Sequence, residues 1–143
     1  MQVSELRSEA GLREAFPVMR DLRTHLDEAT YMDRVRTMTF AGYRLLALRD
    51  GGVIVAVAGI EVATDLHLGR HVWVHDLVTR ADARSRGYGA ALLAHVEDLG
   101  RREACETVAL NSGVQRHDAH RFYETRMGYV RTAYTFAKRV AAA

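Results

Sequence analysis

Cysteine is almost absent from this sequence of 143 residues, which contains only Cys105. A single thiol cannot form an intramolecular disulfide, so the class of disulfide-stabilised extracellular domains is excluded. No apolar run approaches the roughly 20 residues that a membrane-spanning helix needs. The N-terminus also lacks the basic and then apolar stretch of a secretory signal peptide. We therefore expect a soluble cytoplasmic protein without a membrane partner.

An excess of charge of one sign is missing as well. Twenty Lys and Arg residues face eighteen Asp and Glu residues, which gives a formal net charge of +2. This balance does not predict a nucleic-acid partner. The sequence is 48% hydrophobic and 27% charged, proportions that are typical of one globular domain with one core. We expect a single domain over residues 1–143, without internal repeats.

The N-terminal part of the chain shows helical periodicity after a short strand. Weak alternation over residues 3–7 predicts a strand, and apolar residues at helical spacing over 12–26 predict a helix. Pro17 lies inside that pattern and is expected to kink or divide the helix. Thr30 opens a second helical pattern, with Asp33 in the capping-box position.

Beyond residue 42 the pattern changes to the period of β-strands. Apolar stretches over 43–49 and 53–62 flank an Asp-Gly-Gly turn at 50–52, which predicts a β-hairpin. The later predicted elements are a strand over 71–78, a helix that begins near Gly89, a short buried strand over 107–110, a helix over 117–127 and an extended final strand over 129–140. This order indicates an α/β protein with a mixed sheet.

The most informative segment is residues 84–90, Arg-Ser-Arg-Gly-Tyr-Gly-Ala, which leads from a strand into an amphipathic helix. Glycines lack the Cβ atoms that keep a ligand away from the backbone, so amides at the helix N-terminus can contact an anion. Arg84 and Arg86 add positive charge and forked hydrogen-bond donors that suit phosphate oxygens. The segment therefore predicts a pyrophosphate site.

Two other phosphate-binding motifs are excluded by spacing. A Walker loop needs Gly-Lys followed by Ser or Thr, and a dinucleotide fingerprint needs a third glycine where this chain has Leu92. A purely structural glycine turn with solvated arginines remains an alternative. The succession of strand, arginine-glycine segment and amphipathic helix in one stretch argues for the binding interpretation.

Residues 84–90 resemble the acyl-CoA-binding signature of the GNAT acetyltransferases, Gln/Arg-x-x-Gly-x-Gly/Ala. Two further stretches resemble the same family: 119–123, Ala-His-Arg-Phe-Tyr, is similar to its Ala-x-x-Phe-Tyr helix, and 127–129, Met-Gly-Tyr, is similar to the exit from that helix. Residues 115–123 are most similar to one branch, the aminoalkylphosphonate N-acetyltransferases and their relatives.

The resemblance implies a GNAT fold, which is a mixed, mostly antiparallel sheet with a splayed parallel strand pair, flanked by about four helices. It implies an acetyl-CoA-dependent N-acetyltransferase that acts on a primary amine, most simply on a small molecule, by direct attack in a ternary complex. A homodimer is common in such folds. The positions implied to bind the donor are Leu77, Val78, Thr79, Arg84, Ser85, Arg86, Gly87, Tyr88, Gly89, Ala90 and Asn111.

Acetyl transfer to an amine needs an acid and a base. An alkyl amine with a pKa of about 10.4 is mostly protonated at neutral pH, so a base should remove a proton before attack. The departing thiolate leaves more easily when a hydroxyl group donates a proton to it. By resemblance Tyr123 has the family's acid role. The alternative is that Tyr123 is a core residue that packs beside Phe122.

The base is less well marked than the acid. Many family members carry a Glu on the third predicted strand, and the equivalent position here is Trp73, which cannot accept a proton. Asp76 and His75 are the nearby candidates if the strand contains a β-bulge, and we favour Asp76 slightly. It is equally open that neither residue is catalytic and that the amine enters neutral.

Several other observations leave alternatives open. His67, His71 and His75 are spaced by four, but four residues of strand span about 13 Å, which is too far for one ion, and we expect no metal. Arg116 stands where many relatives have Asn, so it could contact an anionic acceptor, a CoA phosphate or only solvent. The missing glutamate also leaves open a noncatalytic acyl-CoA-binding regulatory module, and the acceptor could instead be a protein lysine or N-terminus.

Overall fold

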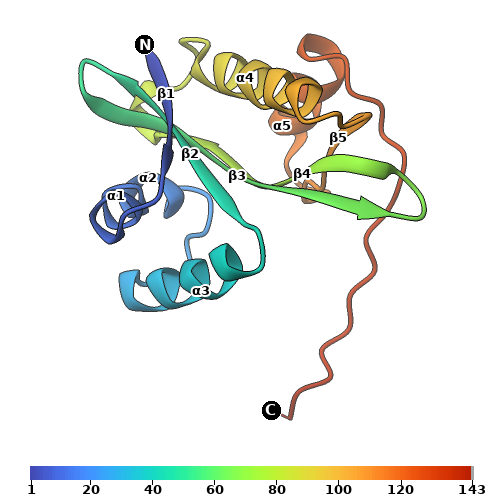
Figure 1. The fold of residues 1–143 in the computed structure, drawn as a ribbon, viewed down its shortest axis with the longest axis horizontal. Helices are drawn as coiled ribbons and strands as arrows, with labels where there is room; N and C mark the ends of the chain where they lie inside the picture. The colour runs from blue at the N-terminus through green and yellow to red at the C-terminus, as the bar shows by residue number, and fades with distance from the viewer. Residues whose placement is uncertain (143) are drawn as a thin grey trace. The chain divides into compact units, whose positions relative to one another are not determined.

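A computed structural model describes residues 1–142 of the chain. By its contacts, Met1–Leu110 form one compact unit and the chain from Asn111 onward forms a second, while the single-domain interpretation stays a prediction. In chain order (Figure 1) the elements are β1 (Gln2–Leu6), α1 (Glu9–Glu14), α2 (Phe16–Met19), α3 (Glu28–Phe40), β2 (Arg44–Asp50), β3 (Val53–Asp65), β4 (Gly69–Thr79), the 3₁₀ turn η1 (Ala81–Ala83), α4 (Tyr88–Arg102), β5 (Thr107–Leu110), α5 (His117–Arg121) and the π-helical turn η2 (Phe122–Arg126).

The first unit is built on a five-stranded sheet with the order β1-β2-β3-β4-β5. Strands β1 to β4 are antiparallel neighbours, and β5 pairs with β4 in parallel. The β4–β5 ladder runs from His71 and Thr107 to Val74 and Leu110, whereas β4 continues to Thr79. The mixed, mostly antiparallel sheet with a parallel strand pair is therefore confirmed, while the splaying of that pair stays a prediction.

The helices of the first unit cover both faces of the sheet (Figure 1), with α4 on one face and α1, α2 and α3 on the other. The apolar stripe of α4, which includes Leu92, Leu93 and Val96, is fully buried. Burial of each such side chain contributes roughly 1.5–3 kcal/mol, so α4 is held by its packing on the sheet. On the opposite face the core contains apolar residues of the three N-terminal helices and of β2, β3 and β4.

The predicted helix over 12–26 is shorter than expected and is divided. Pro17 lies in the first turn of α2, where it needs no backbone N–H, so the chain forms α1 and α2 as separate short helices. Helix α2 ends at Met19, and residues 20–26 follow as turns. The predicted division at Pro17 is confirmed, but the helical pattern beyond Met19 was wrong.

The start of α3 also differs from the prediction. The helix begins at Glu28 rather than at Thr30, because the carboxylate of Asp27 accepts a hydrogen bond from the Thr30 backbone N–H at 2.7 Å. Asp27 is therefore the N-cap. Asp33 lies beyond the first turn of the helix, and its predicted capping-box role is wrong.

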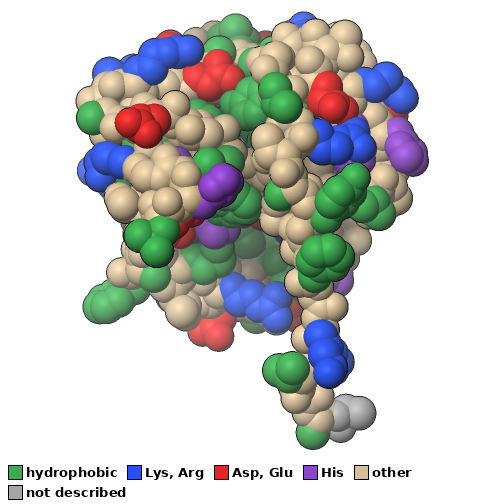
Figure 2. Space-filling model, turned by 90° about the vertical axis from the view of Figure 1, so that its right-hand side faces the viewer, with side chains coloured by type: hydrophobic (Ala, Val, Ile, Leu, Met, Phe, Trp, Pro, Cys, Tyr) green, Lys and Arg blue, Asp and Glu red, His purple; other side chains and the backbone are tan. Residues whose placement is uncertain are grey.

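The second unit contains one short helix and a turn. Helix α5 continues as the π-helical turn η2, which ends at Arg126, in place of the single predicted helix over 117–127. The final strand predicted over 129–140 is wrong, since these residues form neither a helix nor a strand. Hydrophobic side chains, including Tyr134 and Phe136, stand exposed along this segment (Figure 2).

Candidate active site

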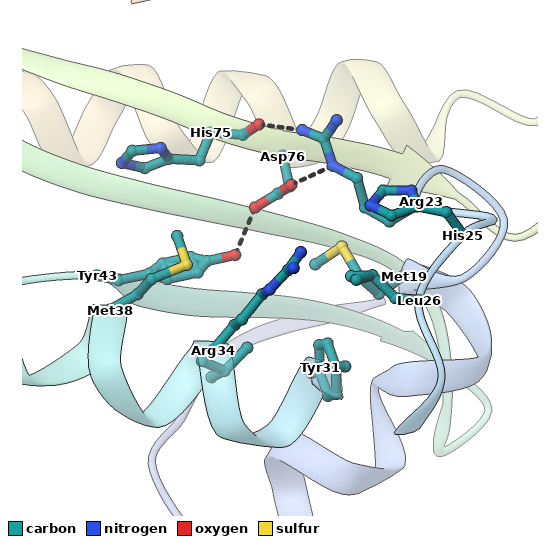
Figure 3. Close-up of a pocket in the computed structure, with 11 residues that line it drawn as sticks. Met19, Arg23, His25, Leu26, Tyr31, Arg34, Met38, Tyr43, His75 and Asp76 are labelled. Carbon is teal, nitrogen blue, oxygen red and sulfur yellow. Dashed lines mark hydrogen bonds and ion pairs between the residues drawn. The ribbon is translucent and has the colours of Figure 1, made fainter. Parts of the chain in front are cut away.

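A β-bulge in β4 places two consecutive polar side chains on one face of the sheet. Gly59 of β3 pairs with Asp76 and the next residue, Ile60, pairs with Val74, so His75 is the extra residue of β4. In a regular strand consecutive side chains point to opposite faces, whereas a bulge turns two of them to the same side. His75 and Asp76 accordingly line the same cavity (Figure 3). The bulge expected from the family resemblance is confirmed.

Asp76 is held by hydrogen bonds to both of its carboxylate oxygens. The Nε of Arg23 donates to Oδ1 at 2.9 Å, and the hydroxyl of Tyr43 donates to Oδ2 at 2.6 Å (Figure 3). A second Arg23 nitrogen donates at 2.8 Å to the backbone carbonyl of His75, which belongs to the bulge. The Asp76 side chain is only 11% exposed, so this arginine neutralises a nearly buried charge.

Tyr43 reaches Asp76 only because residue 59 is a glycine. A Cβ atom at Gly59 would lie 1.7 Å from the Tyr43 hydroxyl oxygen, so the tyrosine ring occupies the space of a missing side chain. Burial, followed by the negative charge of Asp76, raises the pKa of Tyr43 well above its ordinary value of 10.0. Tyr43 therefore remains a protonated donor to Asp76 through the neutral pH range.

His75 has a different partner, Glu61 of β3. Its Nε2 lies 3.0 Å from the Glu61 Oε2, and its ring meets the edge of Tyr43 with centroids 5.6 Å apart. Both side chains of the pair are about one third exposed. Sequence reasoning missed Glu61. The signal that could have found it is the strand register, in which Glu61 lies directly opposite Trp73.

The cavity at the bulge, here named the bulge cavity, has a volume of about 310 Å³. The guanidinium of Arg34 projects into it from α3 (Figure 3), and within residues 1–142 it has no ion pair or hydrogen bond. The neighbouring arginines Arg13 and Arg36 are both paired with glutamates. The lining residues are Met19, Arg23, His25, Leu26, Tyr31, Arg34, Val35, Met38, Tyr43, His75 and Asp76.

The segment over residues 84–90, here named the loop–helix corner, turns from β4 into α4. Gly87 is the N-cap residue of α4 with φ of 84°, in the left-handed region, and no side chain caps the helix N-terminus. Arg84, Ser85 and Arg86 are exposed. The amides of the first turn, flanked by two exposed arginines, fit an anionic group such as a pyrophosphate. The predicted donor-binding residues Gly89 and Ala90 lie in the first turn of α4, which begins at Tyr88.

Tyr88 of the corner departs from the prediction of an open binding residue. Its side chain is 8% exposed, and its hydroxyl donates a hydrogen bond to the carboxylate of Asp50 at the end of β2. The side chain thus fixes α4 against the hairpin. Only the backbone of Tyr88 is available to a ligand at the helix N-terminus.

The segment of β4 between the bulge cavity and the loop–helix corner contains Leu77, Val78 and Thr79. These residues pair with β3 on one side, while the β5 ladder has already ended at Val74 on the other. Val78 is 6% exposed and packs in the core, so its side chain is not available to a ligand. Asp76 and Thr79 are three residues apart, about 10 Å along the strand. One strand thus links the bulge cavity to the loop–helix corner.

The second unit contains the remaining predicted residues, Asn111 and Tyr123. Asn111 is its exposed first residue. Tyr123 is 8% exposed, with the rings of Phe122 and Tyr129 at centroid distances of 5.3 and 6.1 Å. Burial raises the pKa of Tyr123, and the charge and hydrogen bond of Arg116 act in the opposite direction. Tyr123 is therefore a protonated hydroxyl at neutral pH, and it also has the aromatic packing of a core residue.

The histidines have separate partners. The Nδ1 of buried His71 lies 2.9 Å from the Gly69 carbonyl, whereas His75 contacts Glu61. In the part of the chain that the structure describes, no three His, Cys, Asp or Glu residues are grouped to hold a metal ion. No helix among residues 1–142 is long and apolar enough to cross a membrane. On the face shown in Figure 2, positive and negative side chains are interspersed.

A family model and individual sequence relatives both identify the same family. The family described as "Acetyltransferase (GNAT) family" matches residues 11–129. The chain is 40% identical over 141 residues to a Bacillus subtilis (strain 168) protein described as "Uncharacterized N-acetyltransferase YhdJ", covering 98% of this chain and 99% of that protein. It is 36% identical over 99 residues to the aminoalkylphosphonate N-acetyltransferase of Salmonella typhimurium (strain LT2), covering 67% of this chain and 61% of that enzyme.

Solved structures share the fold at lower identity. The aminoglycoside N-acetyltransferase AAC(6')-Iy, in complex with CoA, superposes with a TM-score of 0.84 at 14% identity, covering 99% of this chain and 95% of that one. A GNAT family acetyltransferase from Staphylococcus aureus superposes with a TM-score of 0.79 at 23% identity, covering 97% and 98% of the two chains. These likenesses confirm the architecture.

Proposed function

Because this chain belongs to the GNAT family of acetyltransferases, we propose that it moves an acetyl group from acetyl-CoA to the primary amine of a small molecule, by direct attack in a ternary complex. The enzyme class, N-acetyltransferase, and the donor, acetyl-CoA, are those of the family. The choice of a small acceptor rests on one observation, the bulge cavity of about 310 Å³ beside Asp76.

The loop–helix corner fits the pyrophosphate of the donor. The uncapped amides of α4 and the left-handed backbone at Gly87 suit a bound diphosphate, and Arg84 and Arg86 supply positive charge. We assign the edge of β4 beyond Val74 to the amides of the pantetheine arm, since that edge is not paired with β5. Leu77, Val78 and Thr79 would contribute there through their backbones.

The size and lining of the bulge cavity favour a small acceptor over a protein side chain. A volume near 300 Å³ is at the small end of ligand sites and suits a compact molecule. Methionine and leucine side chains form its apolar wall, while His75 and Asp76 supply polar groups that can orient a small ligand. The Salmonella relative, by its name, acts on an aminoalkylphosphonate, which is also a small amine.

The reaction removes two protons from the acceptor ammonium and delivers one proton to the thiolate. The ammonium group loses its first proton to a base in the bulge cavity, His75 or Asp76, and the neutral nitrogen attacks the thioester carbonyl carbon. A carbon–nitrogen bond forms, the carbon–sulfur bond breaks, and the acylated nitrogen loses its second proton to solvent. We propose that the hydroxyl of Tyr123, which burial keeps protonated at neutral pH, then donates its proton to the departing thiolate.

Thiol release from acetyl-CoA, measured across a panel of small primary amines, tests this proposal. We expect release that depends on the amine, together with an acetylated amine in the products. Tyr123→Phe should lower kcat about 10- to 100-fold and leave the affinity for acetyl-CoA nearly unchanged, because only the proton donor is lost. A protein that binds acetyl-CoA but acetylates no amine would instead fit the noncatalytic alternative, and an unchanged rate in Tyr123→Phe would remove that residue from the reaction.

A further inference from the structure

We propose that Glu61 is a positioning residue that makes His75, rather than Asp76, the general base of the reaction. The inference rests on the proposed function, which needs a base in the bulge cavity but does not choose between His75 and Asp76. The family signature does not point to Glu61. Its part follows from the contacts around the bulge.

Asp76 is poorly placed to accept a proton. Both of its oxygens already accept short hydrogen bonds, from Arg23 at 2.9 Å and from Tyr43 at 2.6 Å. A proton on either oxygen would replace one of these bonds and leave the guanidinium of Arg23 without its full counter-charge. Asp76 therefore holds Arg23, Tyr43 and the bulge in place through these hydrogen bonds.

His75 has the opposite arrangement, because its one ionic partner leaves a ring nitrogen available. An ionised carboxylate can only accept, so the 3.0 Å contact with Glu61 requires a proton on the Nε2 of His75. In the neutral ring the other nitrogen, Nδ1, is then unprotonated and can accept a proton. In the reaction an N–H bond of the acceptor ammonium breaks and an Nδ1–H bond forms, and the proton later passes to solvent.

The charge of Glu61 stabilises the imidazolium that this transfer creates. The titratable and charged groups that face His75 are Glu61 from β3, Asp76 from β4, Tyr43 before β2, Arg23 and His25 from the turns before α3, and Arg34 from α3. Arg23 neutralises Asp76, whereas Glu61 forms its ion pair with His75. Loss of the Glu61 carboxylate therefore makes His75 a weaker base and leaves its ring free to rotate.

The register explains how a carboxylate reaches this place although the family position is Trp73. Glu61 lies opposite Trp73 in the β3–β4 ladder, and His75, two residues beyond Trp73, lies on the same face of the sheet and contacts Glu61. The negative group thus comes from the neighbouring strand and acts on the histidine instead of directly on the substrate.

Two measurements on the wild type, Glu61→Gln, Glu61→Asp and a matched control, Asp65→Asn, test the inference. The control removes one negative charge from the same strand, away from His75. The first measurement follows the His75 ring resonances by NMR over pH, without any substrate. The second is the pH dependence of kcat/KM with an amine that the wild type acetylates, and circular dichroism verifies that each variant is folded.

In Glu61→Gln we expect the His75 titration and the acid limb of the pH–rate profile to move together to lower pH, because the imidazolium loses its negative partner. The plateau rate should fall about tenfold. Glu61→Asp should restore part of both effects, and Asp65→Asn should match the wild type. A Glu61→Gln enzyme that is slower but keeps the wild-type pH profile would overturn the inference, as would a His75 titration that ignores Glu61.

Failure of the proposed function would look different. If no amine is acetylated, there is no rate profile, but the NMR titration still reports whether Glu61 controls the protonation of His75. An unchanged titration then refutes the pairing itself. A shifted titration in a protein without transferase activity confirms the pair and shows that it does not serve acetyl transfer, which also overturns the assignment of His75 as the base.

Discussion

The bulge cavity and the loop–helix corner lie along the same strand, but they are made in different ways. At the corner the ligand-facing atoms belong to the backbone: Gly87 is left-handed, the helix has no side-chain cap, and the one buried side chain, Tyr88, points to Asp50. In the cavity the ligand-facing atoms belong to side chains. The hydrogen bonds from Arg23 and Tyr43 to Asp76 join residues that are 53 and 33 positions apart in the sequence.

This difference determines which of the two sites can be altered by single substitutions of side chains. A backbone site needs only the correct conformation. It therefore tolerates most substitutions at its other positions but is sensitive to a Cβ atom added at its glycines. A side-chain site depends on each partner and can be altered one group at a time. In the proposed enzyme the constant donor is therefore held by backbone, and the acceptor by exchangeable side chains.

We expect the largest effect from Gly59→Ala, which should disrupt the bulge cavity and leave the acetyl-CoA site intact. The new Cβ would lie 1.7 Å from the Tyr43 hydroxyl oxygen, so the ring must leave its place and Asp76 loses a hydrogen bond. We expect kcat/KM for the amine to fall at least about 100-fold, with the affinity for acetyl-CoA retained.

Gly52→Ala is the control for this substitution. It adds a methyl group at a left-handed turn position with nothing within 4 Å, so it should cost about 1–2 kcal/mol of stability without changing the kinetics. Equal losses of activity in the two variants, measured by initial rates, would mean that the packing of Tyr43 on Gly59 does not matter.

Gly87→Val is the converse change. A β-branched residue at φ of 84° is strained, and its side chain stands at the N-terminus of α4. We expect KM for acetyl-CoA to rise about 10- to 100-fold while the bulge cavity is unaffected. Gly87→Asn tolerates the left-handed backbone better, so comparison of the two variants by kinetics and thermal melting separates strain from obstruction. Wild-type KM in both variants would contradict the backbone site.

The tyrosines of the first unit give the molecule a predicted weakness at alkaline pH. Burial and the charge of Asp76 raise the pKa of both Tyr31 and Tyr43 above 10.0. Their contribution is fully present below pH 10, and stability falls above pH 10 because the unfolded chain loses protons that the folded chain retains. The expected slope is up to about 1.4 kcal/mol per pH unit for each tyrosine.

Tyr43→Phe tests that slope and the hydrogen bond together. Loss of the bond to Asp76 should lower the free energy of unfolding by about 1.5–3 kcal/mol at neutral pH. The decline above pH 10 should become shallower, since one tyrosine no longer titrates. Urea denaturation at several pH values measures both quantities, and an equally steep alkaline decline in Tyr43→Phe would show that this residue does not titrate with unfolding.

The smallest effect is expected at the exposed arginines of the corner. Arg84→Ala should weaken binding of acetyl-CoA only about two- to fivefold at low ionic strength, because solvent screens an exposed charge, and the difference should shrink in added salt. Arg7→Ala, an equal charge change at a remote exposed site, serves as the control. A salt-independent loss at Arg84 would indicate a more intimate contact than an exposed side chain provides.

The sequence predicted the corner better than the cavity for the same physical reason. The segment over 84–90 carries its information locally, in glycines and arginines that adjoin a strand and a helix. The cavity arises from strand register and from Arg23, which lies in turns where a longer helix was predicted. The bulge at His75 could be expected from the family, but the Glu61 contact could not.

The element boundaries show the same limit. The hairpin turn at 50–52 and the bounds of the strand over 107–110 follow local rules and were predicted correctly, although that strand is half-buried rather than buried. The start of α3 depends on the competition between two possible caps, and Asp27 is the N-cap that the sequence pattern did not indicate. The segment over 129–140 alternates like a strand, yet a strand forms only when another strand accepts its hydrogen bonds.

The most direct test of the contrast between the two places is calorimetric titration of CoA into the wild type, Gly59→Ala and Gly87→Val under one set of conditions. We predict saturable binding of equal affinity to the wild type and Gly59→Ala, and much weaker binding to Gly87→Val. No heat of binding to the wild type, or an affinity that falls as much in Gly59→Ala as in Gly87→Val, would contradict a donor site made by the backbone at the start of α4.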